Sequence, residues 1–444
     1  MKLTVYRFCL CIRCELLLFR VDNLKLKKMA IPERFPAKLS IRDFQYTLPE
    51  EKIARYPLAE RDESKLLVWQ PGRIRETRYM HIADFLPANS LLLFNDSKVM
   101  AARLIFTKPT GGEIEIFCLE PVHSATGIHQ AMMQTEKGQW KCLIGGASKW
   151  KSGTVLEKKT DQLTLQAKFA EKKTDYFVVE FFWSPAYLAF AQVLHALGSI
   201  PLPPYLKREA EVTDKERYQT IYAAEEGSVA APTAGLHFTD RIFQSLKQKN
   251  IQSLFITLHV GAGTFMPVKS TLIADHRMHS EFMEISGDTV EALAGKLPDP
   301  VLAVGTTSLR TAESLYWLGL KVAANKNIPP AELSLSQWDP YRMEDVLTAK
   351  ESLGALAAWI RRLPEKRFIT STQLFIVPGY RFKIIRGLIS NFHQPQSTLL
   401  LLVAALTGKA WKKIYQFALD NDYRFLSYGD GCLFLPHEGD LDNE

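Results

Sequence analysis

Apolar and polar positions alternate along the chain in a way that predicts strands, loops and helices in a repeating order. An apolar strand, a short loop of small or polar residues and then a helix occur three times, and the strands end at Val260, Val304 and Ser390. This order is typical of an α/β layer with a largely parallel sheet. Because ligands of such sheets bind where the carboxyl ends of the strands open into loops, we expect the three loops to converge on one pocket.

A second pattern lies between about Ser64 and Ser184, where short stretches of alternating residues are separated by glycine-containing turns. It predicts a small antiparallel barrel or sandwich. The expected strands are 101–106, 113–119, 140–144, 163–167 and 177–182. We therefore predict a mixed, largely parallel α/β catalytic domain of residues 29–63 and 185–444, into which a small antiparallel β-barrel domain, residues 64–184, is inserted.

Residues 1–28 precede the first of these patterns. Their apolar stretch is interrupted by charged residues such as Arg7 and Glu15, so it is neither a signal-peptide core nor a membrane span. We expect these residues to be a non-native or disordered extension, with Met29 as the true start. The longest later apolar run, Leu399–Leu406, is also far shorter than a bilayer span, so we predict a cytoplasmic protein with no membrane partner.

The composition is that of an ordinary globular protein, with 444 residues, of which 47% are hydrophobic and 23% charged. The formal charge of +7 allows an anionic partner such as RNA, but many unrelated enzymes are equally basic. Cys11 and Cys14 form a C-x-x-C pair without the second ligand pair that a zinc site requires, and the sequence has no H-E-x-x-H motif. We therefore predict no metal site. The isolated cysteines are interpreted as small buried residues: Cys118, Cys142 and Cys432.

Three loops carry residues suited to binding a ligand. Thr233–His237 precedes a helix with a threonine cap, and free amides at a helix start can bind a carboxylate or phosphate, although an ordinary capped helix is the simpler interpretation. Gly305–Arg310 has the same form, and Arg310 pairs either with a ligand carboxylate or with Glu313 at the surface. The loop from Gly261 to Gly263 lacks the third glycine of a dinucleotide fingerprint, and a structural turn explains it equally well.

Two residues are placed to transfer protons. His393 follows the third strand, and a neutral histidine can accept a proton near pH 7. Asp430 lies between two glycines, which would leave its carboxylate accessible to a pocket. A purely structural role fits either residue as well.

Basic and aromatic residues near the third strand form a candidate RNA contact, because rings stack on splayed bases and cations bind phosphates. This group consists of Tyr380, Arg381, Phe382, Lys383 and Arg386. Half of these residues could equally be side chains of an ordinary strand, which alternate between its two faces. Lys98 and Arg103 are the other candidate phosphate contacts.

Taken together and in order, these motifs resemble one family. The similar stretches include AAPTAGLHFT, HVGAGTF, AVGTTSLR, NFHQPQSTLLLL, PLPPYLKR and YRFLSYGDG, and they run from about Asp43 to Phe434. The family is the S-adenosylmethionine:tRNA ribosyltransferase-isomerases of the queuosine pathway. The resemblance implies an α/β domain that carries a β-barrel domain. It also implies an enzyme that transfers and isomerises the ribosyl part of S-adenosylmethionine onto 7-aminomethyl-7-deazaguanine at the tRNA wobble position, giving epoxyqueuosine and releasing adenine and methionine.

The resemblance further implies roles for single residues. His393, His237 and Asp430 are acid–base candidates, because the ribose carbon next to the sulfonium must lose a proton and the aminomethyl group must be neutral before it attacks. The donor-binding candidates are Thr233, Gly235, Gly261, Gly263, Thr264, Gly305, Thr306, Thr307 and Arg310. S-adenosylmethionine would be a co-substrate and not a true cofactor, the anticodon loop of tRNA would be the partner, and a monomer is expected.

Two positions depart from the family's pattern. Arg386 stands where the family commonly has an acidic residue, and Gly431-Cys432 replaces the usual Ala-Met. Two alternatives therefore stay open: a paralogue that uses the same donor with a different acceptor, and a non-catalytic RNA-binding protein. The retained glycine- and threonine-rich loops, together with His393 and Asp430, argue against the second.

Overall fold

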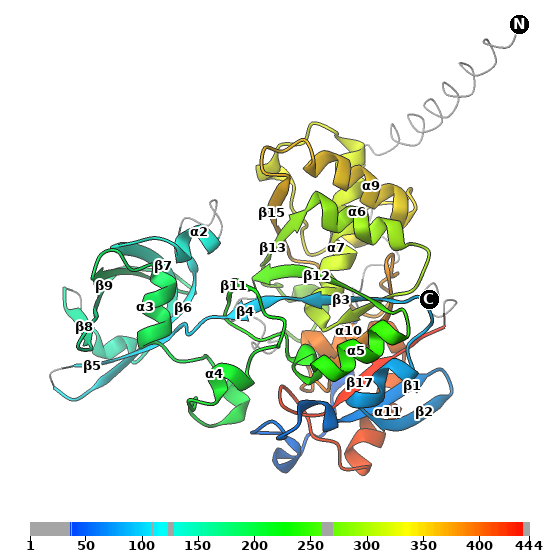
Figure 1. Ribbon diagram of the computed structural model, residues 1–444, viewed down its shortest axis with the longest axis horizontal. Helices are drawn as coiled ribbons and strands as arrows, with labels where there is room; N and C mark the ends of the chain where they lie inside the picture. Colours follow the sequence, from blue (N-terminus) through cyan, green and yellow to red (C-terminus); the bar gives the residue numbers. More distant parts are fainter. Residues whose placement is uncertain are drawn as a thin grey trace, which may run out of the picture.

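The computed structural model describes residues 36–437 except 37, 109, 123–127, 152 and 260–269. It consists of an α/β body and a β-barrel that stands to one side of it (Figure 1). The strands of the body are β1 (Lys65–Gln70), β2 (Arg73–Arg78), β3 (Leu91–Asn95), β12 (Gln252–His259), β13 (Glu281–Ser286), β14 (Val301–Val304), β15 (Arg367–Thr372), β16 (Ile385–Asn391) and β17 (Gly431–Phe434). They form one mixed sheet in the order β15-β13-β12-β3-β14-β16-β17-β1-β2.

The middle of this sheet is parallel, and its strand β3 is buried on both faces. Strands β12, β3, β14 and β16 run in the same direction, and β17 and β1 form a further parallel pair, whereas the other pairs are antiparallel. In β3, Leu91 and Leu93 join the core on one face, while Leu92 and Phe94 join the core on the other. A continuous apolar run such as this one is what a strand covered on both faces requires.

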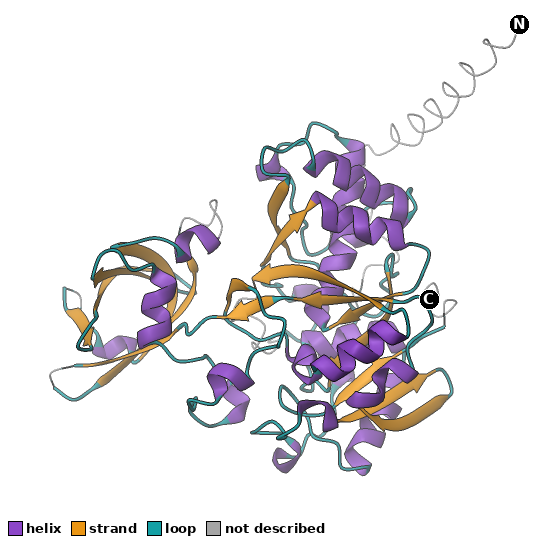
Figure 2. Ribbon diagram, in the orientation of Figure 1, coloured by secondary structure: helices purple, strands orange, loops and turns teal. Residues whose placement is uncertain are grey.

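Helices cover the two faces of the sheet (Figure 2). The helix α5 (Asp240–Gln248) packs on one face through Ile242 and Leu246. The core of the other face includes side chains of α6 (Gly287–Lys296), α7 (Thr306–Ala324), α8 (Asp339–Arg342), α9 (Ala349–Ile360), α10 (Thr398–Thr407) and α11 (Ala410–Asp420). In the described part of the chain, no helix has both the length and the apolar character needed to cross a membrane.

The barrel is a six-stranded antiparallel sheet with its own core. Its strands are β5 (Arg103–Thr107), β6 (Glu113–Pro121), β7 (Lys137–Gly145), β8 (Val155–Lys159), β9 (Thr164–Lys172) and β10 (Phe177–Ser184), and their order is β5-β6-β7-β10-β9-β8. The edge strands β5 and β8 lie close together, so the sheet is nearly closed. Trp140 and Phe181 fill the interior against Phe190 of α3 (Phe190–Leu197), and α2 (Ile128–Met132) packs on the same core.

Two short connections link barrel and body. Strand β4 (Ser97–Val99) pairs in parallel with β11 (Glu225–Ser228), next to the point where the chain enters the barrel. The chain leaves the barrel after α3, passes through the proline-rich loop at 201–208 and reaches the short helix α4 (Asp214–Arg217).

The predicted fold class, a mixed α/β domain with an inserted antiparallel barrel, is confirmed. The stretch expected to be the inserted domain, 64–184, nevertheless contains β1, β2 and β3 of the large sheet, and the first barrel strand begins at Arg103. The difference arises because β3 is inserted between β12 and β14, which come much later in the chain, so its partners cannot be inferred from its neighbours in sequence. Strand β8 was not predicted, because its pattern is polar and largely exposed.

Candidate active site

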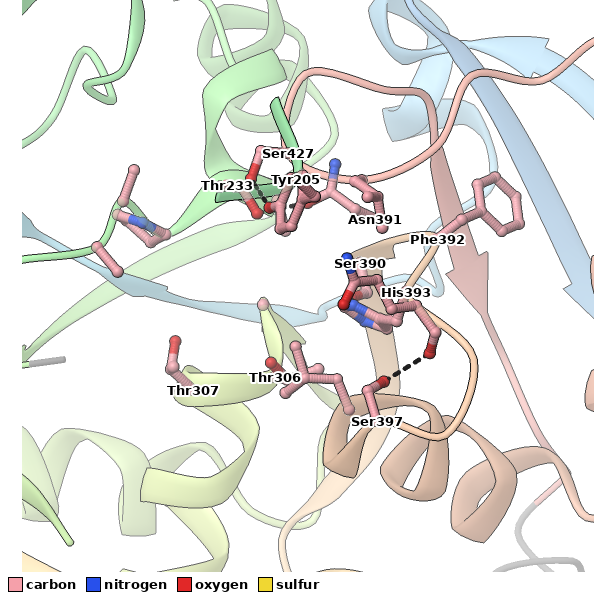
Figure 3. A pocket seen from close by; sticks show the side chains of 18 of the residues that line it. Tyr205, Thr233, Thr306, Thr307, Ser390, Asn391, Phe392, His393, Ser397 and Ser427 are labelled. Carbon is pink, nitrogen blue, oxygen red and sulfur yellow. Dashed lines mark hydrogen bonds between the residues drawn. The ribbon is translucent and has the colours of Figure 1, made fainter. Parts of the chain in front are cut away.

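A pocket opens at the carboxyl edge of the parallel strands, where the loops after β14 and β16 meet the segment 230–234 (Figure 3). It holds about 890 Å³ of empty space including its open mouth. The described lining residues are Tyr205, Ala230, Ala231, Pro232, Thr233, Ala234, Gly305, Thr306, Thr307, Ser390, Asn391, Phe392, His393, Gln394, Pro395, Ser397, Leu399, Leu426 and Ser427. Within this described lining, no side chain is an aspartate, glutamate, lysine or arginine. The polar groups are hydroxyls, amides and one imidazole.

The loop after β14 brings a helix start to the pocket. Gly305 has φ +93°, a backbone conformation that favours glycine, and it serves as the N-cap of α7 without a side-chain cap. The first amide groups of α7, at Thr306 and Thr307, therefore begin a helix at the pocket wall. The positive end of the helix dipole and these uncapped N–H groups favour a negatively charged or strongly polar group in front of them.

The loop after β16 holds His393 in a fixed position. Its Nε2 lies 2.8 Å from Ser390 Oγ, its backbone N–H donates to the Tyr415 hydroxyl at 3.1 Å, and its carbonyl accepts a hydrogen bond from the Tyr46 hydroxyl. Burial lowers the pKa of His393 to about 3, so the ring is neutral near pH 7. A neutral imidazole that lines a pocket can accept a proton.

His237 and Asp430, the other two acid–base candidates, are not among the described lining residues of this pocket. The Nδ1 of His237 lies 3.2 Å from the carbonyl oxygen of Arg61, and burial lowers its pKa to about 4. The Asp430 carboxylate accepts hydrogen bonds from the backbone N–H groups of Lys65 (2.9 Å) and Arg424 (2.7 Å). Asp430 thus fastens the start of β1 to the loop before β17.

Comparison with known proteins identifies the family. The family described as Queuosine biosynthesis protein matches residues 41–434 of the chain. The chain belongs to this family.

Relatives of the family align along nearly the whole chain. A protein named S-adenosylmethionine:tRNA ribosyltransferase-isomerase from Halothermothrix orenii is 37% identical over 405 residues, which cover 89% of this chain and 100% of the relative. Proteins of the same name from Legionella pneumophila (strain Corby) and Azoarcus sp. are 38% and 36% identical and are covered to 99% each, over 89% and 90% of this chain. A crystal structure of an S-adenosylmethionine tRNA ribosyltransferase from Thermotoga maritima matches with 28% identity and a TM-score of 0.42, covering 88% of this chain and 100% of that one.

The donor-binding candidates lie in three kinds of place. Thr233, Gly305, Thr306 and Thr307 line the pocket, whereas Gly235 lies behind it, where an added Cβ would come within 1.9 Å of the Tyr222 hydroxyl. Gly261, Gly263 and Thr264 fall outside the described residues.

Arg310 is buried and lies outside the described lining. It forms an ion pair with Glu281 at 2.8 Å, and its Nε donates to the carbonyl of Leu374 at 3.0 Å. The alternative of a surface pair with Glu313 is wrong, because Glu313 is itself fully buried and accepts hydrogen bonds from other groups.

Most of the RNA-contact candidates are buried or paired within the protein. The Tyr380 ring is buried and its hydroxyl donates to Glu313, so this ring is not available to stack on a base. Lys383 forms an ion pair with Asp345, Lys98 with Glu226 at 3.3 Å, and Arg103 with Glu115 at 2.6 Å. Arg381 is exposed.

The two departures from the family's pattern lie away from the described pocket lining. The Arg386 guanidinium donates to the carbonyl of Ile385 within β16. At Gly431, an added Cβ would lie 2.0 Å from the Tyr79 hydroxyl, so glycine at this position leaves room for that tyrosine.

Sequence reasoning missed several lining residues, among them Tyr205, Ser390 and Ser427. The Tyr205 hydroxyl lies 2.5 Å from Ser427 Oγ, so this pair joins the 201–208 loop to the loop before β17 at the pocket. Both residues stand inside family-like stretches, PLPPYLKR and YRFLSYGDG. Their place in these stretches was the signal available in the sequence. Hydroxyl side chains carry no charge, and these residues follow no characteristic spacing, so nothing else marked them as pocket residues.

Proposed function

We propose that the chain is an S-adenosylmethionine:tRNA ribosyltransferase-isomerase. It would transfer and isomerise the ribosyl part of S-adenosylmethionine onto 7-aminomethyl-7-deazaguanine at the wobble position of tRNA, giving epoxyqueuosine and releasing adenine and methionine. A tRNA substrate would place the protein in the cytoplasm. The observation that carries the proposal is the neutral pocket at the sheet edge, built from the stretches AAPTAGLHFT, AVGTTSLR and NFHQPQSTLLLL of a chain that aligns with its relatives over about nine-tenths of its length.

The neutral lining suits a sulfonium donor. A carboxylate beside the sulfonium would stabilise the cationic substrate, yet that charge disappears when methionine leaves as a thioether. Catalysis requires that interactions strengthen in the transition state and not in the ground state. A described lining without carboxylates meets this requirement.

His393 is the proposed proton acceptor at the ribose carbon next to the sulfonium. It is the imidazole of the described lining, and its backbone and ring are held by Tyr415 and Ser390. In this role it would take the proton that the sulfonium acidifies, and the imidazolium would later return a proton to a leaving group. The amides of Thr306 and Thr307 at the α7 start would receive the carboxylate of the methionine part.

The decisive assay combines the protein, S-adenosylmethionine and tRNA that carries 7-aminomethyl-7-deazaguanine. Mass spectrometry is expected to show epoxyqueuosine in the tRNA and an equal amount of free adenine. Donor binding without any change in this tRNA would instead support the paralogue. Arg386, which motivated the paralogue, lies outside the described pocket lining, so no observation favours that alternative.

His393→Gln is expected to lower kcat by about 10²–10⁴, the range for loss of a general acid–base. The dissociation constant of S-adenosylmethionine should change far less. His195→Gln is the matched control, because His195 is exposed on α3 of the barrel. A kcat within threefold of wild type for His393→Gln would exclude His393 as the base.

A further inference from the structure

A line of polar groups runs from the carbonyl of Arg61 to the pocket wall. The carbonyl oxygen of Arg61 lies 3.2 Å from His237 Nδ1, and His237 Nε2 lies 3.5 Å from Asn391 Nδ2. The Thr233 hydroxyl lies 2.8 Å from Asn391 Oδ1. His237 and Asn391 are buried, with 4% and 3% of their surface exposed, whereas Thr233 is partly exposed and lines the pocket.

The direction of every hydrogen bond in this line follows from its first member. A carbonyl oxygen only accepts, so Nδ1 of His237 carries the hydrogen. Burial and the nearby guanidinium groups of Arg424 and Arg61 disfavour a second proton on the ring, so Nε2 is an acceptor. It therefore receives the amide N–H of Asn391, although the contact is long. The amide oxygen of Asn391 is then left to accept the hydroxyl hydrogen of Thr233.

The consequence concerns the oxygen of Thr233. Its only hydrogen is committed to Asn391, so toward the pocket this oxygen presents lone pairs alone. It can accept a hydrogen bond from a ligand but cannot donate one.

His237 itself is shielded from a ligand in the pocket. Its ring stacks on Tyr79, with centroids 4.2 Å apart, and Tyr79 is fully buried. The imidazole does not belong to the described lining. His237 instead lines a separate small hollow with Arg61 and Tyr428. Its link to the wall of the larger pocket is the contact with Asn391.

We propose that His237 is a positioning residue that, through Asn391, fixes Thr233 as a hydrogen-bond acceptor for a hydroxyl or amino N–H group of the donor substrate. The identity of that substrate rests on the proposed function. The relay itself rests on the geometry of the four residues.

The functional test is a double-mutant cycle of Thr233→Val and His237→Gln, with steady-state kinetics in S-adenosylmethionine. Loss of one neutral hydrogen bond corresponds to about a fivefold change, so Thr233→Val is expected to raise KM for the donor about fivefold with little effect on kcat. His237→Gln should act in the same direction. Because both variants would break the same contact, the double variant is expected to be no worse than Thr233→Val alone. His195→Gln serves as the matched histidine control.

Two results would overturn the relay. One is a fall in kcat of a hundredfold or more in His237→Gln at constant KM, which would make His237 an acid–base catalyst. The other is a KM for the donor in the double variant that rises by the product of the two single effects, about 25-fold if each variant loses one hydrogen bond. That result would show that the two residues act independently.

A spectroscopic test does not depend on turnover. In wild-type protein labelled with ¹⁵N-histidine, the His237 signal, assigned by its absence in His237→Gln, should report the Nδ1–H tautomer at pH 7. The Nε2–H tautomer or a doubly protonated ring would overturn the relay. If wild-type protein fails to modify the tRNA, the proposed function fails, and this spectrum still decides the relay.

Discussion

Arg310 and Glu281 form an ion pair that is almost completely withdrawn from water, with exposed fractions of 3% and 0%. Replacing Arg310 by methionine would remove the guanidinium from the buried Glu281 carboxylate, which also contacts His279 Nε2 at 3.0 Å. Breaking such a pair costs about 3–5 kcal/mol, so Arg310→Met is expected to lower the free energy of unfolding by about that amount in urea titrations. The reason is the loss of the guanidinium charge beside the carboxylate and not lost packing.

The double variant Arg310→Met/Glu281→Leu separates these two causes. A buried pair replaced on both sides by apolar residues is often as stable as the original, so this variant should recover most of the loss. If the single and the double variant lost the same unfolding free energy, the guanidinium would contribute through the space that it fills and not through its charge.

Single residues were predictable from sequence where a motif alone fixes their place. Thr233, Thr306, Thr307 and His393 were expected at one pocket and line one pocket. The partner of Arg310 was not predictable, because Glu281 belongs to a different strand, β13. The carboxylate nearest in sequence, Glu313, instead accepts the backbone N–H groups of the segment 383–385, which helix spacing cannot reveal.

At the scale of elements, the close approach of α7 and α9 depends on a glycine. An added Cβ at Gly319 of α7 would lie 2.2 Å from the carbonyl oxygen of Ser352 in α9, which is backbone and cannot move aside. Overpacking of this kind costs about 1–3 kcal/mol. Gly319→Ala is therefore expected to lower the unfolding free energy by that amount, measured by thermal or urea unfolding.

Gly354 in α9 provides the matched control, because it is exposed and an added Cβ there meets nothing within 4 Å. Alanine is the better helix former by about 0.5–1 kcal/mol, so Gly354→Ala should stabilise the protein. If Gly319→Ala also stabilised it, the two helices would not be packed as closely as described.

The sequence predicted elements well where periodicity and a cap coincide. Strand β14 ends at Val304 as expected, and the helix expected after β16, α10, starts after Ser397, whose hydroxyl accepts the Leu400 N–H. It predicted sheet membership poorly for β1 and β3, because pairing with strands 160 residues or more further along the chain leaves no local trace.

At the scale of the whole molecule, three histidines with lowered pKa values link stability to pH. Burial lowers the pKa of His237 to about 4 and that of His393 to about 3, and it also lowers the pKa of His276. Histidine in an unfolded chain titrates near pH 6.5. Below that pH the unfolded state therefore binds more protons than the folded state, so stability falls as the pH falls.

The carboxyl group of Asp96 changes stability with pH in the opposite sense. Burial raises the pKa of Asp96 to about 6, so between pH 6 and its unfolded value the folded state takes up a proton that the unfolded state does not. This uptake stabilises the folded state as the pH falls and offsets part of the histidine effect. Asp96 is partly exposed, and solvent screening reduces its share.

The net expectation is a loss of unfolding free energy on acidification from pH 6.5 to pH 4. Each histidine that stays neutral in the folded protein contributes about 1.4 kcal/mol per pH unit to the slope of unfolding free energy against pH. With the offset from Asp96, urea titrations should show a net slope of about 1–2 kcal/mol per pH unit. His393→Gln should reduce this slope, because it removes one proton from the difference between the two states. A stability that is flat over this range, or a slope that survives His393→Gln in full, would mean that the pocket imidazole is already open to water and protons in the folded protein.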